Sequence, residues 1–209
     1  MKIKVCGNTV IGQLKELNDL EIDYLGLIFY DQSPRCVLNK LIGKEVRESV
    51  ISKTKVGVFV NASEEEIMKQ VEGFGLDMVQ LHGDETASFC KRISDHIKVI
   101  KAFRISDIDA NVDWLVKEYE EVCDYYLFDK GSAGLYGGTG QKFNWDVLKN
   151  STIGKPFFLS GGIEKKDAGA VKKFTHPFFY GIDVNSRFET SPGVKNIGLI
   201  KEFVKELKE

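Results

Sequence analysis

Short, almost continuously apolar segments recur along the chain, roughly one every 25 residues, with more polar stretches between them. Such runs, rich in Val, Ile, Phe and Tyr, are typical of strands that are buried on both faces of a parallel sheet. The pattern predicts eight strands, at 3–7, 24–30, 56–61, 78–83, 99–104, 125–130, 156–162 and 178–185.

The stretches between these segments predict amphipathic helices. The best marked begins after Ser63, where three glutamates occupy the first turn, and Gly73 and Gly75 supply a stop signal. Further helices are predicted at 10–20, 39–51, 86–97, 145–148, 164–174 and 197–207. Eight strands alternating with helices favour a single-domain (β/α)8 TIM barrel over residues 1–209, because a doubly wound sheet normally uses five or six strands.

Composition and charge argue against several classes of protein. The 29 basic and 31 acidic residues give a net charge of −2, so we expect no nucleic-acid partner. No signal peptide and no membrane span are expected, because no apolar run approaches about 18 residues. The cysteines, at 6, 36, 90 and 123, show no metal-binding spacing and do not suggest a disulfide framework. We therefore expect a cytoplasmic protein without a metal site.

Polar residues gather at the ends of the predicted strands, where barrel enzymes place their chemistry. Cys6 would be a buried, inert thiol or, as a thiolate, a nucleophile or base. Asp129 would cap its loop or act as a general acid. His82 would be a structural imidazole or a wall of the pocket, and we favour the pocket.

Two features suit an anionic ligand. Arg35 follows Ser33-Pro34 and is either a surface residue or a fork for a carboxylate. Gly161-Gly162 follow the seventh strand, where backbone N–H groups of barrels often bind phosphate; tight turns are the alternative.

Seven short motifs occur at these strand ends in a fixed order. They are KVCGNT at 4–9, SPR at 33–35, VGVFVN at 56–61, VQLHG at 79–83, GGTG at 137–140, LSGG at 159–162 and DVNS at 183–186. In this order the chain closely resembles the phosphoribosylanthranilate isomerases, the (β/α)8 isomerases of tryptophan biosynthesis. The resemblance runs from about residue 2 to the C-terminal helix.

The resemblance implies an Amadori rearrangement of a small-molecule substrate, N-(5'-phosphoribosyl)anthranilate, to 1-(2-carboxyphenylamino)-1-deoxyribulose 5-phosphate, without a cofactor. It implies that Asp129 is the general acid, Cys6 the general base and Arg35 the partner of the anthranilate carboxylate. The further substrate-binding residues expected on this basis are His82, Gly138, Gly140, Gly161, Gly162, Asp183, Asn185 and Ser186. Monomer and homodimer both stay open.

Arg187 departs from the family pattern, in which a glycine commonly follows the last phosphate motif. Its side chain would contact phosphate or turn outward to pair with Glu189, and we favour the outward turn. Two other functions stay open. A histidine-pathway sugar isomerase of the same chemistry would be expected to use aspartates as acid and base, unlike Cys6. A non-catalytic sensor of a phosphorylated aromatic ligand would not need Cys6 and Asp129 together.

Overall fold

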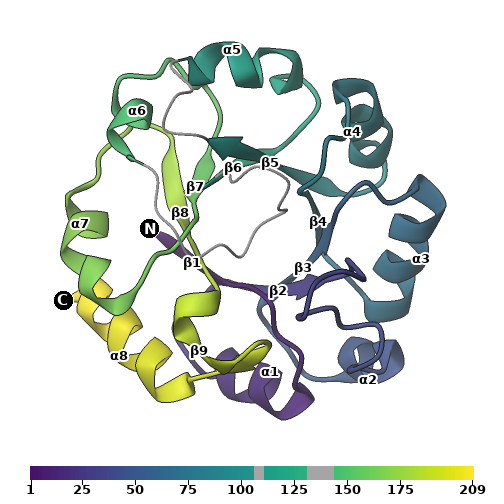
Figure 1. Ribbon diagram of the computed structural model, residues 1–209. Helices are drawn as coiled ribbons and strands as arrows, with labels where there is room; N and C mark the ends of the chain where they lie inside the picture. The colour runs from purple at the N-terminus through teal and green to yellow at the C-terminus, as the bar shows by residue number, and fades with distance from the viewer. Residues whose placement is uncertain (106–110, 131–143) are drawn as a thin grey trace.

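The computed structural model describes residues 1–105, 111–130 and 144–209 and shows a closed barrel of eight parallel strands surrounded by helices (Figure 1). Neighbouring strands follow chain order, and β8 pairs with β1 to close the barrel. The strands are β1 (Lys2–Val5), β2 (Tyr24–Ile28), β3 (Thr54–Phe59), β4 (Met78–Leu81), β5 (Lys98–Ile105), β6 (Tyr125–Lys130), β7 (Phe157–Leu159) and β8 (Phe179–Val184). The predicted (β/α)8 architecture is confirmed.

Helices cover the outside of the barrel. They are α1 (Ile11–Asn18), α2 (Gly43–Glu48), α3 (Glu64–Phe74), α4 (Ala87–Ser94), α5 (Val112–Val116), α6 (Asp146–Lys149), α7 (Ala168–Lys173) and α8 (Ile197–Lys208). Short 3-10 turns are η1 (Lys117–Tyr119), η2 (Lys165–Asp167) and η3 (Ser186–Phe188). The predicted helix at 39–51 is wrong in extent, and α5 and η1 have no counterpart among the predicted helices. In the described residues no helix has the length and hydropathy of a membrane-spanning segment.

Local sequence explains the bounds of α3. The Ser63 hydroxyl accepts a hydrogen bond from the Glu66 N–H, and the Glu66 carboxylate accepts one from the Ser63 N–H at 2.8 Å. This capping box satisfies N–H groups that the first turn leaves without partners. At the other end Gly75 adopts a left-handed conformation, with φ of +62°, and its N–H reaches the Val71 carbonyl. The predicted start and stop are therefore confirmed.

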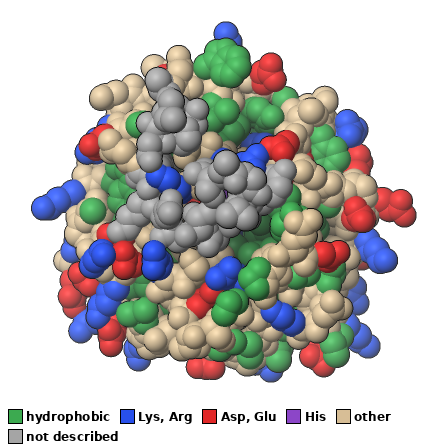
Figure 2. All heavy atoms as spheres, viewed as in Figure 1, with side chains coloured by type: hydrophobic (Ala, Val, Ile, Leu, Met, Phe, Trp, Pro, Cys, Tyr) green, Lys and Arg blue, Asp and Glu red, His purple; other side chains and the backbone are tan. Residues whose placement is uncertain are grey.

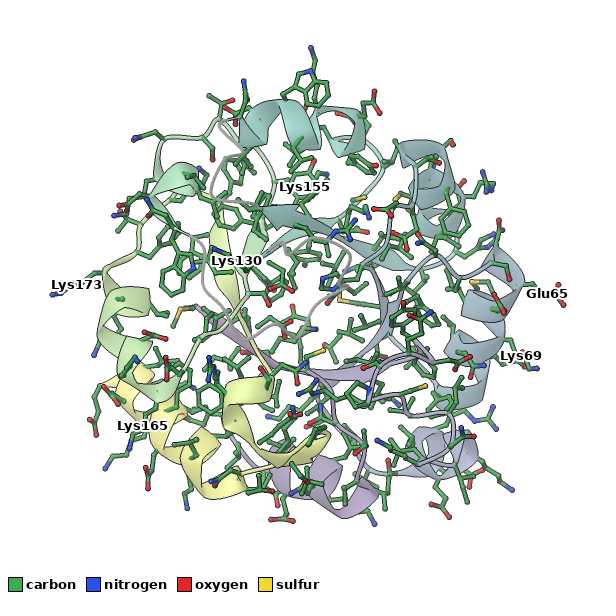
Figure 3. The ribbon with its side chains drawn as sticks, in the orientation of Figure 1. Glu65, Lys69, Lys130, Lys155, Lys165 and Lys173 are labelled. Carbon is green, nitrogen blue, oxygen red and sulfur yellow. The ribbon has the colours of Figure 1, made fainter. Side chains whose placement is uncertain are left out.

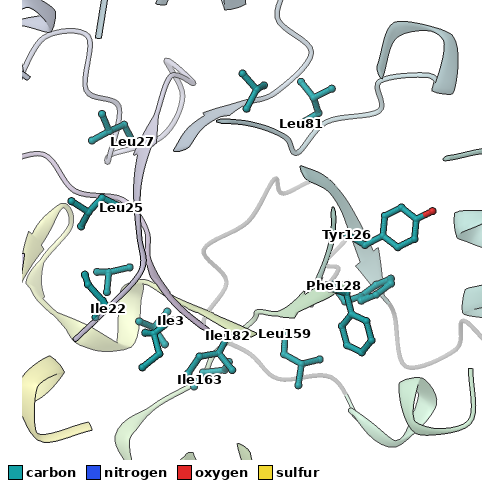
Figure 4. Packing of buried hydrophobic residues seen from close by; sticks show 14 of the residues in the cluster. Ile3, Ile22, Leu25, Leu27, Leu81, Tyr126, Phe128, Leu159, Ile163 and Ile182 are labelled. Atoms are coloured by element: carbon teal, nitrogen blue, oxygen red, sulfur yellow. The ribbon is translucent and has the colours of Figure 1, made fainter. Parts of the chain in front are cut away.

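Apolar side chains form two separate layers. The larger layer lies between strands and helices, and Figure 4 shows Leu25, Tyr126, Phe128 and other labelled members on the outer side of the barrel wall. A second cluster fills the barrel interior: Tyr24, Val56, Met78, Ile100, Ala102, Leu127 and Phe158. Two residues after Met78, Leu127 and Phe158, and so on the same inward face, lie the buried polar residues Gln80, Asp129 and Ser160.

A small hairpin follows β8. It consists of β9 (Glu189–Ser191) and β10 (Val194–Lys195), which pair antiparallel, and Figure 1 shows β9 beside α1. Thr9 donates to the Gly193 carbonyl at 2.8 Å, which joins the hairpin to the loop after β1. This hairpin was not predicted, and it brings two charged residues, Glu189 and Lys195, back to the barrel mouth.

Candidate active site

The carboxyl ends of four strands place Cys6, His82, Asp129 and Asp183 in the barrel mouth, and all four side chains are buried. Cys6 follows β1 and His82 follows β4, whereas Asp129 and Asp183 are the penultimate residues of β6 and β8. On the face seen in Figure 2, basic and acidic side chains are interspersed around the rim. Figure 3 shows Lys130, the neighbour of Asp129, over the barrel opening, whereas Lys69 and Lys173 point outward from the helices.

A buried ion pair lies beneath Cys6. The Lys4 Nζ is 3.0 Å from Asp183 Oδ1, and neither side chain has appreciable access to solvent. Lys4 precedes Cys6 by two residues, so both side chains point to the barrel interior. Burial lowers the pKa of Lys4, but its interactions with Asp183 and Cys6 together outweigh burial and raise that pKa above its ordinary value. Lys4 therefore stays an ammonium.

The surroundings of Cys6 disfavour its thiolate. Burial raises its pKa above the ordinary value of a cysteine, and this effect exceeds the opposing attraction of Lys4 and Lys195. Asp183 raises the pKa further. A base at this position must therefore lose its proton before it acts, and the two lysines are the groups that favour the thiolate.

Asp129 lies between an imidazole and a backbone N–H. The His82 Nε2 is 3.4 Å from Asp129 Oδ2, and the Lys130 N–H donates to Oδ1 at 2.8 Å. Gln80, which was not predicted, lies with its side-chain amide 2.8 Å from His82 Nδ1 and so fixes the orientation of the ring, whose Nε2 faces Asp129. Within the described residues His82 Nε2 has no hydrogen-bond partner, which leaves it available to a ligand.

Gly161 and Gly162 have φ angles of +87° and +63°, a conformation that favours glycine. An added Cβ at Gly161 would lie 2.9 Å from Asp129 Oδ1, so the backbone passes close to that carboxyl group. Only glycine gives a ligand such close access to backbone N–H groups at this point. Phosphate binding at these two glycines stays a prediction, and Gly138 and Gly140 lie outside the described residues.

Arg35 is bound to Glu189 of β9. Its Nε lies 3.0 Å from both carboxylate oxygens, and its Nη2 lies 2.7 Å from Oε2. The Lys195 Nζ approaches the other side of Glu189, 2.7 Å from Oε1, and also donates to Asn185 Oδ1 at 2.9 Å. The favoured outward turn of Arg187 agrees with its exposure in η3, but Glu189, its expected partner, binds Arg35 and Lys195 instead. The Glu189 side chain is 4% exposed and turns inward to these two cations, of which Lys195 is fully buried.

Arg35, expected to bind the carboxylate, and Asn185, expected to bind the phosphate, both lie against Gly7, the residue directly after Cys6. An added Cβ at Gly7 would lie 2.6 Å from Asn185 Oδ1 and 2.8 Å from Arg35 Cδ, and Ser186 follows at the start of η3. Gly7 has φ of +74°, so both its conformation and its surroundings require glycine.

Sequence reasoning missed four residues that hold this arrangement together. They are Lys4, Gln80, Glu189 and Lys195. A signal existed for Lys4, because a lysine at an inward position of an apolar strand requires a buried partner. Glu189 and Lys195 had no local signal, because their partners are brought to them by the hairpin.

Comparison with known proteins places the chain in a family. A family model described as N-(5'phosphoribosyl)anthranilate (PRA) isomerase matches residues 3–206. The N-(5'-phosphoribosyl)anthranilate isomerase of Parabacteroides distasonis is 40% identical, with 99% of this chain and 93% of the relative covered. That of Phocaeicola vulgatus is 37% identical, with 100% and 98% covered.

Solved structures of isomerases from the same family are also similar to this chain. Phosphoribosyl anthranilate isomerase from Thermotoga maritima superposes with a TM-score of 0.82 at 28% identity, covering 100% of this chain and 98% of the other. An isomerase in complex with reduced 1-(o-carboxyphenylamino)-1-deoxyribulose 5-phosphate gives 0.74 at 28% identity, with the same coverage. The chain belongs to the N-(5'-phosphoribosyl)anthranilate isomerase family.

Proposed function

We propose that this chain isomerises N-(5'-phosphoribosyl)anthranilate to 1-(2-carboxyphenylamino)-1-deoxyribulose 5-phosphate, an Amadori rearrangement in tryptophan biosynthesis. Family membership over nearly the whole chain supports this substrate and reaction. One observation on this chain carries the chemistry: Cys6 and Asp129 reach the same barrel mouth from β1 and β6. A base and an acid can thus act on one sugar from different strands.

Asp129 performs the first step as the general acid. It gives its proton to the ribose ring oxygen while the C1–O bond breaks, and the anilino nitrogen lone pair forms a C=N bond to C1. The product is an open-chain, protonated Schiff base. The carboxylate left on Asp129 is stabilised by the Lys130 N–H at 2.8 Å and faces the His82 Nε2 at 3.4 Å.

Cys6 performs the second step as the general base. Its thiolate removes the proton from C2, and the C2–H electron pair moves towards the cationic nitrogen to give an enolamine. The 2-hydroxyl then loses its proton and C1 gains one, which leaves the C2 ketone. The ammonium groups of Lys4 and Lys195 favour the thiolate that this step requires.

The two ends of the substrate are anionic and need separate partners. Arg35 binds the anthranilate carboxylate, in keeping with a guanidinium fork at the rim of the mouth. The backbone at Gly161 and Gly162, together with Asn185 and Ser186, binds the phosphate, with Gly138 and Gly140 proposed on the resemblance alone. His82 and Asp183 border the sugar between these ends.

We further propose that the enzyme works in the cytoplasm, where a reducing environment would keep its four free cysteines reduced. Both a monomer and a homodimer stay open for it, although the Thermotoga maritima relative is described as dimeric. Sedimentation velocity at micromolar concentration distinguishes the two states.

Turnover tests the function directly. The purified chain should convert N-(5'-phosphoribosyl)anthranilate generated in situ, followed as loss of its anthranilate fluorescence. Cys6→Ala and Asp129→Asn should each lower kcat by at least about 10²-fold with a smaller change in KM, because each removes proton transfer in the transition state. Either residue loses its assigned role if its variant keeps more than about a tenth of the activity.

Matched controls separate chemistry from folding. Cys90→Ala removes a buried thiol from α4, and Asp124→Asn removes a carboxylate that caps the Val99 N–H at the opposite end of the barrel. Both controls should keep kcat near the wild-type value. A wild-type protein that binds the product analogue without turnover would support a sensor in place of an enzyme.

A further inference from the structure

Three charged side chains form a buried cluster beside the catalytic thiol. The exposed fractions of the Arg35, Glu189 and Lys195 side chains are 12%, 4% and 0%. Two cations share one carboxylate, so the cluster carries one surplus positive charge. Buried surplus charge is costly unless a counter-ion compensates it. The surplus charge would therefore stabilise an anion that binds at this cluster.

The pKa values agree with this surplus. Burial lowers the pKa of Lys195, and the positive charge of Arg35 lowers it further, against the attraction of Glu189 and Cys6. For Glu189, burial would raise the pKa, but Arg35 and Lys195 outweigh burial and lower it below the ordinary value of a glutamate. The carboxylate therefore stays charged and keeps both cations in place.

The geometry fixes which part of Arg35 can meet a ligand. Glu189 takes up Nε and Nη2, and Nη1 makes no hydrogen bond within the described residues. The guanidinium is planar and rigid, so a carboxylate that holds one edge also sets the direction of the other edge. The Arg35 stem passes over Gly7, where an added Cβ would lie 2.8 Å from Cδ. The Arg35 stem thus runs past Gly7, the residue directly after Cys6, while Glu189 fixes the orientation of the guanidinium.

Glu189 is itself held from behind. Lys195 binds the Glu189 carboxylate and the Asn185 side chain, and its own backbone exchanges two hydrogen bonds with the Gln13 side chain of α1, at 2.7 and 2.8 Å. The hairpin therefore presents Glu189 from a fixed support, and Arg35 has little freedom to turn.

We propose that Glu189, supported by Lys195, is a positioning residue that aims the outer edge of Arg35 at the carboxylate of the substrate, so that the β9–β10 hairpin determines specificity for an aromatic carboxylate. This inference rests on the proposed function and adds to it a source of selectivity outside the residues that touch the substrate.

The test compares two ligands that differ only in the carboxylate: the reduced product analogue named above and its phenylamino counterpart without the carboxylate. In Glu189→Gln the amide cannot accept from Arg35 through both oxygens, so the guanidinium is no longer fixed. We expect binding of the carboxylated analogue to weaken about tenfold or more, and binding of the other analogue to change less than about twofold. For turnover, KM should rise by a similar factor while kcat changes less than about threefold.

A double-mutant cycle separates positioning from a general structural role. In the Arg35→Ala background, Glu189→Gln should have no further effect on the affinity of the carboxylated analogue, because its influence passes through Arg35. Asp23→Asn, which breaks an ion pair with Lys2 at the other end of the barrel, is the matched control and should leave both affinities unchanged.

The outcomes are distinct. If the wild type does not turn over its substrate, the proposed function fails. If turnover is normal but Glu189→Gln weakens both analogues equally, or adds to Arg35→Ala, then the positioning role is wrong. Should Glu189→Gln fail to fold by circular dichroism, Glu189→Asp, which keeps the charge but shortens the reach, enters the same ligand comparison and cycle with the same expectations.

Discussion

Gly26→Ala probes how tightly the fold encloses the thiol of Cys6, the proposed general base. Gly26 lies in β2, and an added Cβ would be 2.6 Å from Cys6 Sγ and 2.9 Å from Cys6 Cα. Unstrained contacts between such atoms are about 3.5–4.0 Å, so Cys6 or β2 has to move by about 1 Å. The strand is held, because the Gly26 carbonyl accepts from both the backbone and the side chain of Asn8, each at 3.1 Å.

Two opposing effects set the expected loss of stability in Gly26→Ala. Overpacking costs about 1–3 kcal/mol, and the smaller entropy of the unfolded chain with alanine returns about 0.4–1 kcal/mol. The net loss is therefore at most roughly 2.6 kcal/mol, which corresponds to a fall in Tm of up to roughly 10 °C for a chain of this size. A misplacement of about 1 Å in a catalytic group can cost about 10²-fold in kcat.

Thermal unfolding and turnover measure these effects on the same samples. Gly12→Ala is the matched control, because an added Cβ in α1 meets no atom within 4 Å. It should raise the free energy of unfolding by roughly 0.5–1 kcal/mol without a change in kcat. In a Cys6→Ala background the cost of Gly26→Ala should shrink, since the sulfur contact is gone. A Gly26→Ala protein with wild-type Tm and kcat would refute the reasoning.

Two further predictions concern buried ion pairs. Lys4→Met removes a charge that lowers the pKa of the Cys6 thiol, so that pKa should rise further. The increase of kcat/KM with pH should then move to higher pH, and an unchanged profile would exclude an electrostatic role for Lys4. Glu85→Gln leaves the buried Lys101, 2.8 Å away, without its charged partner, and should lower the free energy of unfolding by about 3–5 kcal/mol. Tm should fall by well above 5 °C, and a fall within 2 °C would contradict the expectation.

The barrel could be predicted because parallel strands buried on both faces leave a direct mark in the sequence. The predicted ends of strands and helices were less accurate, because the pattern of side chains does not report backbone conformation. The seventh strand was predicted to reach 162 but ends at Leu159, since Gly161 and Gly162 adopt positive φ. The helix at 39–51 was overextended because Ile42 and Val50, assigned to its buried face, are 62% and 94% exposed.

The site shows the same division. Cys6, Asp129 and Asp183 could be placed together because the closed barrel brings strand ends to one mouth. The partners of Arg35 could not be found in this way. Glu189 and Lys195 reach it only because an irregular hairpin folds back over the loop after β1, and its docking depends on contacts between segments that are more than 150 residues apart.

The electrostatics of Cys6 bear on the order of the steps in the proposed mechanism. Burial raises the pKa of its thiol, and an anionic substrate does nothing to favour the thiolate. In the proposed mechanism, protonation of the ring oxygen by Asp129 leaves the substrate with a cationic nitrogen bonded to C1, which would acidify C2–H and add to the attraction of Lys4 for a thiolate. We infer that the base becomes competent only after the acid has acted.

This order predicts different behaviour for the two catalytic variants. Cys6→Ala should open the ring and accumulate the Schiff base, which cyanoborohydride reduces to a stable amine that mass spectrometry detects. Asp129→Asn should bind the substrate but yield little of that amine, because the ring stays closed. Equal trapping in both variants would show that ring opening does not need the Asp129 carboxyl group, and the assignment of Asp129 as the general acid would then be wrong.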